Sequence, residues 1–458
     1  MQRPPAAKHV EPGLRVGFLV VGRKRRGFDM EYGGRMEEAA WAAMGEAPFG
    51  AVRPTTRVID DGTLRQALAE LRTQQCDALV VLQPIMGDGR LAPVLAQLWG
   101  DPPVLWATPE KPDGGKVSSC SLVGAHAFGS TLRQLGRQFE IVYGNPGDAK
   151  TRHQLATAVR LTAAFSKLRR SKVGLVGAHA PGFINMQADP AAMSRQLGIE
   201  LCHFGLAEFF DLVESQSDEA VAEDLKRVQA LELPLEDGVT ADDLPQNSRF
   251  YLAIDAMLDQ ENLDALALRC WPEVPNRFGQ WPYLAMARLA GENRAVALEG
   301  DTDGAICSLV GRLLRIGAGY LSDWLAHDEH AITLWHPGHA PLYLCAAGTA
   351  RLGRHFNSGH PLVINATLAA ELPITLFRLW RLDGRYRMTA ADARTALPQR
   401  ELAGAHGVAL LEDRRVPDWF DFLCHEGMPH HVAVFPGHHA ALLRRLARLL
   451  GIEWLDLK

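Results

Sequence analysis

Short apolar runs alternate with amphipathic segments along the first part of the chain. Residues 14–22 (LRVGFLVVG) form one such run, and a helical spacing of apolar positions follows at 36–44. The pattern repeats in the apolar runs 77–84 and 104–110, with a helix-like segment at 91–100 between them. Buried strands that alternate with helices are typical of a parallel sheet covered on both faces. The pattern therefore predicts a doubly wound α/β domain.

Two changes in this pattern divide the chain. A helical run ends near residue 168, and the strand-like segment 171–180 restarts the alternation. Residues 361–387 contain strand-length runs around an Asp-Gly turn signal, and an amphipathic helix follows at 439–451. The prediction is two doubly wound parallel-sheet domains followed by a C-terminal antiparallel β module with a closing helix, with domains at 1–170, 171–345 and 346–458.

Three predicted strands of the middle domain end in polar residues. The first ends just before Glu273, the second at Glu299 and Asp301, and the third at His336; they read LDALALRC, RAVALEGD and AITLW. Ligands of parallel sheets bind at the carboxyl ends of the strands, so we expect these side chains to meet at one edge of one sheet. Asp301 also stands where a helix N-cap belongs, so a purely structural role is open for it.

A mixed set of carboxylates and imidazoles suits Mn²⁺, Mg²⁺ or Fe²⁺ better than a structural zinc ion. The C-terminal segment MPHHVAV offers His430 and His431 to complete such a set. Neighbouring residues of a strand face opposite sides, so only one of the two is expected to reach the site. The other, together with His438 and His439, is then a surface or supporting residue.

Composition narrows the classes of function. The chain of 458 residues is long enough for two or three domains, and its formal net charge of −5 argues against nucleic acid as a partner. Its seven cysteines are scattered and odd in number, which indicates a reducing compartment. The first residues lack an apolar signal region, and no later stretch has the length of a membrane span. We therefore expect a cytoplasmic protein without a membrane partner.

Four short motifs, in order, resemble the L-fucose/L-arabinose isomerase family, including its shorter members. They are ALRCWPE (267–273), LEGDTDGA (298–305), TLWHPGHAP (333–341) and MPHHVAV (428–434). The resemblance implies a metal-dependent aldose–ketose isomerase, an intramolecular oxidoreductase that acts on an open-chain sugar through an enediolate intermediate. A pentose, a deoxyhexose and a sulfonated or phosphorylated hexose are all open as substrates.

The resemblance also implies roles for individual residues. Glu273 matches one metal-binding carboxylate, and the second is Glu299 by the arabinose-type pattern or Asp301 by the fucose-type pattern. Asp301 is favoured, because Thr302 stands where arabinose-type enzymes have a Trp. Glu273 and Asp301 would also act as the acid/base pair. Two histidines complete the ligand set implied by the resemblance: His336 and His431.

The remaining expectations concern substrate, metal and assembly. His336 and Trp335 are expected to contact the sugar, and Mn²⁺ is the expected metal, with Mg²⁺ or Co²⁺ as alternatives. The resemblance implies a homo-oligomer, a trimer or hexamer, in which the N-terminal domain of one subunit closes the site of its neighbour. His126, in the segment SLVGAHAFG, is the expected contribution from that domain.

Two other classes of protein compete with an isomerase. The glycine-bearing segment 174–182 (GLVGAHAPG) follows a strand, as in a NAD-dependent sugar dehydrogenase, although it lacks the G-x-G-x-x-G pattern. A non-catalytic two-lobed sugar-binding or regulatory protein could share the fold. The candidate metal-binding carboxylates favour the enzyme, since a sugar-binding protein has no need of them.

Overall fold

The computed structural model describes residues 13–22, 27–87, 89–113 and 115–457. The chain divides into two compact units, one formed by Glu11–Lys167 and one that contains Leu168–Lys458. The three-domain division at 170/171 and 345/346 remains a prediction. The first twelve residues, which bear on the expected absence of a signal segment, lie outside the described residues.

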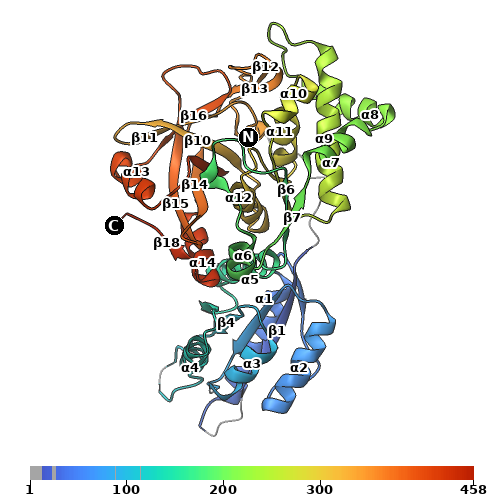
Figure 1. Cartoon of the computed structure of the whole chain (residues 1–458). Helices are drawn as coiled ribbons and strands as arrows, with labels where there is room; N and C mark the ends of the chain where they lie inside the picture. Colours follow the sequence, from blue (N-terminus) through green and yellow to red (C-terminus); the bar gives the residue numbers. More distant parts are fainter. Residues whose placement is uncertain (1–12, 23–26, 88, 114, 458) are drawn as a thin grey trace. The chain divides into compact units, whose positions relative to one another are not determined.

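The N-terminal unit contains a five-stranded parallel sheet in the order β2-β1-β3-β4-β5 (Figure 1). Helices α2, α3 and α4 pack on one face through Leu68, Leu95 and Phe128, while α1 and α5 pack on the other. This is the doubly wound arrangement expected from the alternating pattern. The strands are β1 (Arg15–Val20), β2 (Gly50–Val52), β3 (Ala78–Gln83), β4 (Val104–Ala107) and β5 (Glu140–Tyr143), and the helices are α1 (Met30–Gly45), α2 (Asp61–Thr73), α3 (Ala92–Leu98), α4 (Ser121–Gln134) and α5 (Ala149–Leu168).

A second parallel sheet begins the other unit, in the order β7-β6-β8-β9. Its main helices bury Phe209, Phe250 and Met286 against the strands. The second predicted parallel sheet is thus confirmed. The strands are β6 (Lys172–Val176), β7 (Glu200–Phe204), β8 (Ala265–Leu268) and β9 (Ala295–Ala297), and the helices are α7 (Leu206–Glu214), α8 (Asp218–Gln229), α9 (Leu244–Gln260), α10 (Glu273–Phe278), α11 (Tyr283–Gly291) and α12 (Thr302–Leu313).

A six-stranded antiparallel barrel follows in the same unit. Its strands pair in the order β16-β11-β10-β17-β14-β15, and β15 pairs back to β16. The Asp-Gly signal forms the two-residue turn of the β14–β15 hairpin, because Leu382 pairs with Arg385. The strands are β10 (Tyr320–His327), β11 (Ala331–His336), β14 (Pro373–Leu382), β15 (Arg385–Ala396), β16 (Ala405–Leu410) and β17 (His431–Pro436).

Shorter elements extend the barrel. Strands β12 (Arg351–Arg354) and β13 (Pro361–Thr367) continue it from β16, and β18 (Glu453–Trp454) pairs with β15. Helices α13 (Val416–His425) and α14 (Ala440–Leu450) complete this part of the chain. The expected antiparallel module with a final helix is confirmed.

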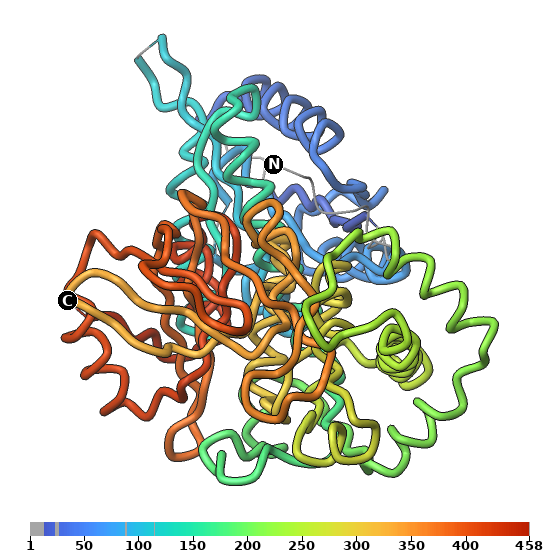
Figure 2. Tube along the Cα trace, turned by 90° about the horizontal axis from the view of Figure 1, so that it is seen from above, coloured from blue at the N-terminus to red at the C-terminus, as the bar shows by residue number. Residues whose placement is uncertain are grey.

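One strand was assigned to the wrong sheet. The segment AITLW was expected as a third parallel strand, but β11 lies between β10 and β16 in the barrel. Figure 2 shows the β10–β11 hairpin beside the C-terminal segments. The residues of β11 alternate between half-buried and buried, whereas β8 and β9 are buried throughout. That alternation is typical of an antiparallel strand.

Helix α12 joins the parallel sheet to the barrel. It contacts β8 and β9 on one side and β14 and β17 on the other. The Sγ atom of Cys307 on this helix accepts a hydrogen bond from the backbone N–H of Leu379 in β14, at 3.3 Å. Helix α12 is therefore held by both layers.

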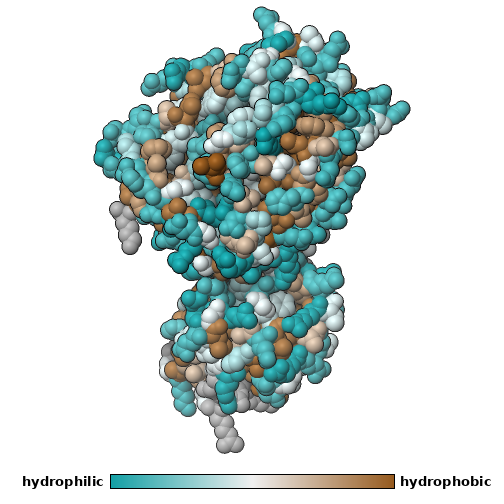
Figure 3. Space-filling view, viewed as in Figure 1, coloured by the Kyte–Doolittle hydropathy of each residue, from teal (hydrophilic) through white to brown (hydrophobic). Residues whose placement is uncertain are grey.

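None of the described helices combines the length and apolar character needed to cross a membrane. Hydrophilic residues are spread over the face drawn in Figure 3, with hydrophobic residues between them.

The turn between β9 and α12 has an unusual backbone. Glu299 and Gly300 both have positive φ angles, 60° and 69°. A Cβ atom at Gly300 would lie 2.1 Å from the carbonyl oxygen of Ala178, so only glycine fits there. A non-glycine residue at positive φ costs free energy and is often found at functional sites. The backbone at Glu299 is held in this conformation by its neighbours.

We predict that Gly300→Ala lowers the free energy of unfolding by at least about 2 kcal/mol, because the new methyl group meets a backbone oxygen and forces the turn apart. Gly291→Ala is the control, because a Cβ at the end of α11 would have no atom within 4 Å. It should change stability by less than about 1 kcal/mol. Urea unfolding of the two variants is the measurement, and equal effects would contradict the prediction.

Candidate active site and metal centre

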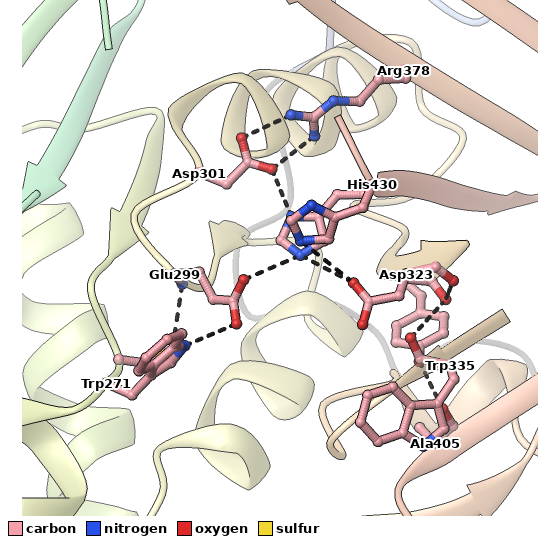
Figure 4. Close-up of polar contacts among 12 residues, drawn as sticks. Trp271, Glu299, Asp301, Asp323, Trp335, Arg378, Ala405 and His430 are labelled. Carbon is pink, nitrogen blue, oxygen red and sulfur yellow. Dashed lines mark hydrogen bonds and ion pairs between the residues drawn. The ribbon is translucent and has the colours of Figure 1, made fainter. Parts of the chain in front are cut away.

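The imidazole of His431, at the start of β17, lies among three carboxylates. Its Nδ1 atom is 2.9 Å from Oδ2 of Asp301, and its Nε2 atom is 3.3 Å from Oε2 of Glu299 and 3.4 Å from Oδ1 of Asp323. His431 is completely buried. Figure 4 shows Glu299 and Asp323 approaching the histidines from opposite sides. We call these four residues together with His336 the His431 cluster.

Asp301 is held by a buried ion pair. Arg378 of β14 donates to both carboxylate oxygens at 2.8 and 3.0 Å, and both side chains are fully buried (Figure 4). Asp301 also accepts the backbone N–H of Gly304 as the N-cap of α12. Burial alone would raise the pKa of Asp301, but the charge of Arg378 and the contact with His431 outweigh it and hold the pKa far below its usual range.

The same contacts set the charge of His431. Burial disfavours the imidazolium, but the carboxylates of Asp301 and Glu299 outweigh burial and raise the pKa of His431 to about 10. Burial, together with the charge of Glu299, raises the pKa of Asp323 to about 6. Burial also lowers the pKa of His336. Without a metal ion, the protonated His431 therefore offsets the negative charge of the surrounding carboxylates.

Several atoms of the His431 cluster are suited to bind a cation. Glu299, His430 and His431 offer one group of ligand atoms within 4.8 Å of one another, and Asp323, His336 and His431 offer a second. Nε2 of His431 and Oε2 of Glu299 face each other without a well-formed hydrogen bond, and Nδ1 of His336 has no hydrogen-bond partner among the described residues. Such buried atoms call for an explanation, and a cation coordinated by oxygen and nitrogen provides it.

The His431 cluster forms part of the wall of a cavity of about 410 Å³. Glu299, Asp323 and His336 line it, as do Trp271 and Trp335. The Nε1 atom of Trp271 donates to Oε1 of Glu299 at 2.9 Å, which leaves Oε2 toward His431 (Figure 4). The volume lies within the range of small-molecule sites.

The structure brings together four of the residues expected from the sequence: Glu299, Asp301, His336 and His431. Trp335 lines the same cavity. Their convergence does not come from one sheet edge, because Glu299 and Asp301 follow a parallel strand while His336 and His431 belong to the barrel.

Two other expected residues are not part of the His431 cluster. Glu273, in the first turn of α10, forms a bidentate ion pair with Arg269 and belongs to neither group of potential ligands. His126 lies on α4 of the N-terminal unit, where it is exposed. The metal-binding and catalytic roles of Glu273, and the substrate contact of His126, remain predictions.

The expectation that only one of His430 and His431 reaches the site remains a prediction, and the two rings lie close together. The two ring centroids are 4.4 Å apart, and His430 belongs to the same group of potential ligands as Glu299. The strand β17 begins at His431, so His430 lies just before it. His430 lines the cavity, whereas His431 is fully buried among the carboxylates beside it.

Two residues of the site were not anticipated. Asp323 is the carboxylate of the apolar strand β10, and Arg378 is a buried arginine in β14. A charged residue in an apolar strand is seldom fully buried unless it is paired. That exception to the apolar pattern is the signal from which both residues could have been found.

The C-terminal part of this chain has known relatives. The family described as L-fucose isomerase, C-terminal domain, matches residues 345–458. The C-terminal segment is therefore similar to this family. It supplies Arg378 and His431, whereas Glu299, Asp323 and His336 precede the matched residues.

Full-length similarity extends over the whole site. The chain is 24% identical over 443 residues to sulfoquinovose isomerase of Priestia megaterium, covering 95% of this chain and 97% of the relative. It is 25% identical over 390 residues to sulfoquinovose isomerase of Alkalicoccus urumqiensis, covering 83% and 86%. L-arabinose isomerase of Geobacillus thermodenitrificans matches at 24% over 212 residues, 45% of this chain and 42% of the relative.

We predict that Asp301→Ala lowers the free energy of unfolding by about 3–5 kcal/mol, because it leaves Arg378 buried without its counter-charge and removes a helix cap. The control is Glu329→Ala, which breaks an ion pair with Arg415 whose side chains are 61% and 56% exposed. Exposed pairs contribute about 1 kcal/mol or less. Chemical denaturation of metal-free protein tests this, and a loss at Asp301 no larger than at Glu329 would contradict it.

A second prediction concerns pH in the metal-free protein. The pKa of His431 is raised to about 10, above the usual value of about 6.5 for an unfolded chain. Its contribution to stability is therefore complete below about pH 6.5 and is lost as the pH rises toward 10. The melting temperature of EDTA-treated protein should fall across this window, and less steeply in His431→Gln. Identical pH profiles for the two proteins would contradict the assignment.

Proposed function

We propose that the protein is a metal-dependent aldose–ketose isomerase. The observation that carries this proposal is the His431 cluster on the wall of a cavity of about 410 Å³. The full-length similarity to sulfoquinovose isomerases and the partial similarity to an L-arabinose isomerase support it. The dehydrogenase and the non-catalytic binding protein become outcomes of the test below.

The ligands that fit best are Glu299, Asp323, His336 and His431, with His430 beside them. This oxygen and nitrogen set suits Mn²⁺ best, and Mg²⁺ or Co²⁺ as alternatives. When bound, the divalent ion supplies a fixed positive charge that stabilises the negative charge developing on two neighbouring sugar oxygens. Asp301 acts as a positioning residue, because its contact with Nδ1 of His431 directs Nε2 toward Glu299 and Asp323.

Isomerisation moves a proton between two neighbouring carbons of an open-chain sugar. A carboxylate at the cavity has to remove the proton from one carbon and return it to the other. Glu299 and Asp323 both line the cavity, whereas Asp301 is enclosed by Arg378 and His431. We therefore assign proton transfer to Glu299 and Asp323, and contact with the sugar to Trp335 and His336.

The narrower substrate class is a hexose with a sulfonate group, by similarity to the sulfoquinovose isomerases. We also propose a homo-oligomer, a trimer or hexamer, in which the exposed His126 of α4 contributes to a neighbouring site. Localisation in the cytoplasm belongs to the same proposal.

We predict that EDTA abolishes ketose formation and that Mn²⁺ restores it, because every proposed ligand atom is oxygen or nitrogen. Ketose formation is measured with a panel of pentoses, deoxyhexoses, and hexoses that carry a sulfonate or phosphate. Full activity in metal-stripped protein would contradict the metal-dependent mechanism. Turnover that requires NAD would favour the dehydrogenase, and sugar binding without any turnover would favour the binding protein.

Two matched variants test whether Glu299 or Glu273 is the metal-binding carboxylate. Glu299→Gln and Glu273→Gln remove the same charge and keep the same shape. The geometry leads us to expect that Glu299→Gln loses at least about 100-fold in kcat and in metal affinity, and that Glu273→Gln loses much less. If Glu273→Gln loses more activity and metal affinity than Glu299→Gln, Glu273 is the ligand. Its contacts with Arg269 must then break in the active enzyme.

A further inference from the structure

The loop 355–360, between β12 and β13, forms another part of the cavity wall. Five of its six residues line the cavity: His355, Phe356, Asn357, Ser358 and His360. The loop is connected to the His431 cluster through a row of aromatic rings, in which His355 stacks on Trp281, Trp281 on Tyr283, and Tyr283 meets His336 edge-on. Tyr283 also lies 6.4 Å from His355 between ring centroids, so a single ring separates the loop from His336 of the cluster.

Hydrogen bonds hold the loop in one conformation. The Nδ1 atom of His355 accepts the backbone N–H groups of Asn357 and Ser358, each at 3.3 Å. Burial lowers the pKa of His355 to about 4, so the ring is neutral at physiological pH and Nδ1 can accept. Trp281 donates to the hydroxyl of Ser358 at 2.9 Å. Polar groups on such a pre-organised loop bind a ligand without a large loss of entropy.

Three polar side chains around this part of the cavity are available to a ligand. The amides of Asn276 and Asn357 and the imidazole of His360 line the cavity and make no side-chain hydrogen bond to another described residue. Arg354, at the base of the loop, donates to the carbonyl oxygens of Gly238 and Gly359. Among the described residues, no carboxylate forms an ion pair with Arg354.

Charge is distributed unevenly along the cavity. The two carboxylates that line it within the described part of the chain, Glu299 and Asp323, both belong to the His431 cluster. The loop offers amide and imidazole donors, and the exposed Arg354 donates to the carbonyl oxygen of Gly359 within it. Donors to a charged acceptor form hydrogen bonds roughly twice as strong as those to a neutral one. This end of the cavity is therefore complementary to an anion.

We propose that the loop 355–360 is a specificity subsite for a tetrahedral oxyanion carried on the sugar carbon furthest from the reacting carbons. Asn357 and His360 donate hydrogen bonds to the anion, and His355 positions the loop. This inference rests on the proposed isomerase function and names the residues that select its substrate. Sulfonate and phosphate share the required chemistry.

The test compares three aldohexoses of the same configuration, with a sulfonate, a phosphate or a hydroxyl group on carbon 6. Asn357→Ala and His360→Ala should each lower the ratio of kcat/KM for the anionic sugar to kcat/KM for the neutral sugar by at least about tenfold, mainly through KM. His425→Ala, at a histidine whose side chain is 82% exposed on α13, is the matched control. An equal loss on all three sugars in Asn357→Ala and His360→Ala would overturn the subsite. The sulfonate and phosphate arms show which anion is preferred.

Equilibrium binding separates this inference from the proposed function. A 6-sulfonated alditol has no carbonyl group and cannot be isomerised, so calorimetric titration measures its binding alone. We expect binding by the unaltered protein and at least about tenfold weaker binding by His360→Ala. If no aldose is turned over but this difference persists, the isomerase function fails and the subsite stands. If the alditol does not bind, or binds both proteins equally, the subsite is wrong.

Discussion

The buried ion pair between Arg378 and Asp301 is the interaction on which the site depends. Transfer of two charges out of water costs several kcal/mol per ion, so such a pair persists only where its remaining polar atoms are also satisfied. Here Asp301 accepts from Arg378, from the N-terminus of α12 and from His431. One carboxylate therefore connects the turn after β9, the central helix and two strands of the barrel. It also fixes which nitrogen of His431 faces Glu299 and Asp323.

Much of this arrangement could be predicted from the sequence, because apolar runs and turn signals are local. The parallel sheets and the Asp-Gly turn of the β14–β15 hairpin follow from such signals. The motifs indicated Glu299, Asp301, His336 and His431, although not through the single sheet edge on which they were expected to meet. The sheet to which β11 belongs could not be predicted. A strand as short as β11 fits both a parallel and an antiparallel sheet until its partner strands are known. Asp323 and Arg378 were not predicted, because a charged residue in an apolar strand is a local signal that does not identify its distant partner.

The family match and the site overlap only in part. Residues 345–458 supply His431 and Arg378, while Glu299, Asp323 and His336 come from earlier elements. The matched C-terminal segment therefore does not contain Glu299 and Asp323, the two carboxylates that line the cavity. The match to sulfoquinovose isomerase of Priestia megaterium, which covers 95% of this chain at 24% identity, extends over these earlier positions as well.

The long separation along the chain between the partners of His431 has a consequence for folding. Asp301 and His431 are 130 residues apart, and Asp301 and Arg378 are 77 apart. Contacts of such high contact order form late, because the closure of a long loop has to precede them. We therefore expect the site to be completed only when the parallel sheet and the barrel dock through α12. An ion that binds the completed site but not the unfolded chain adds its binding free energy to that last step.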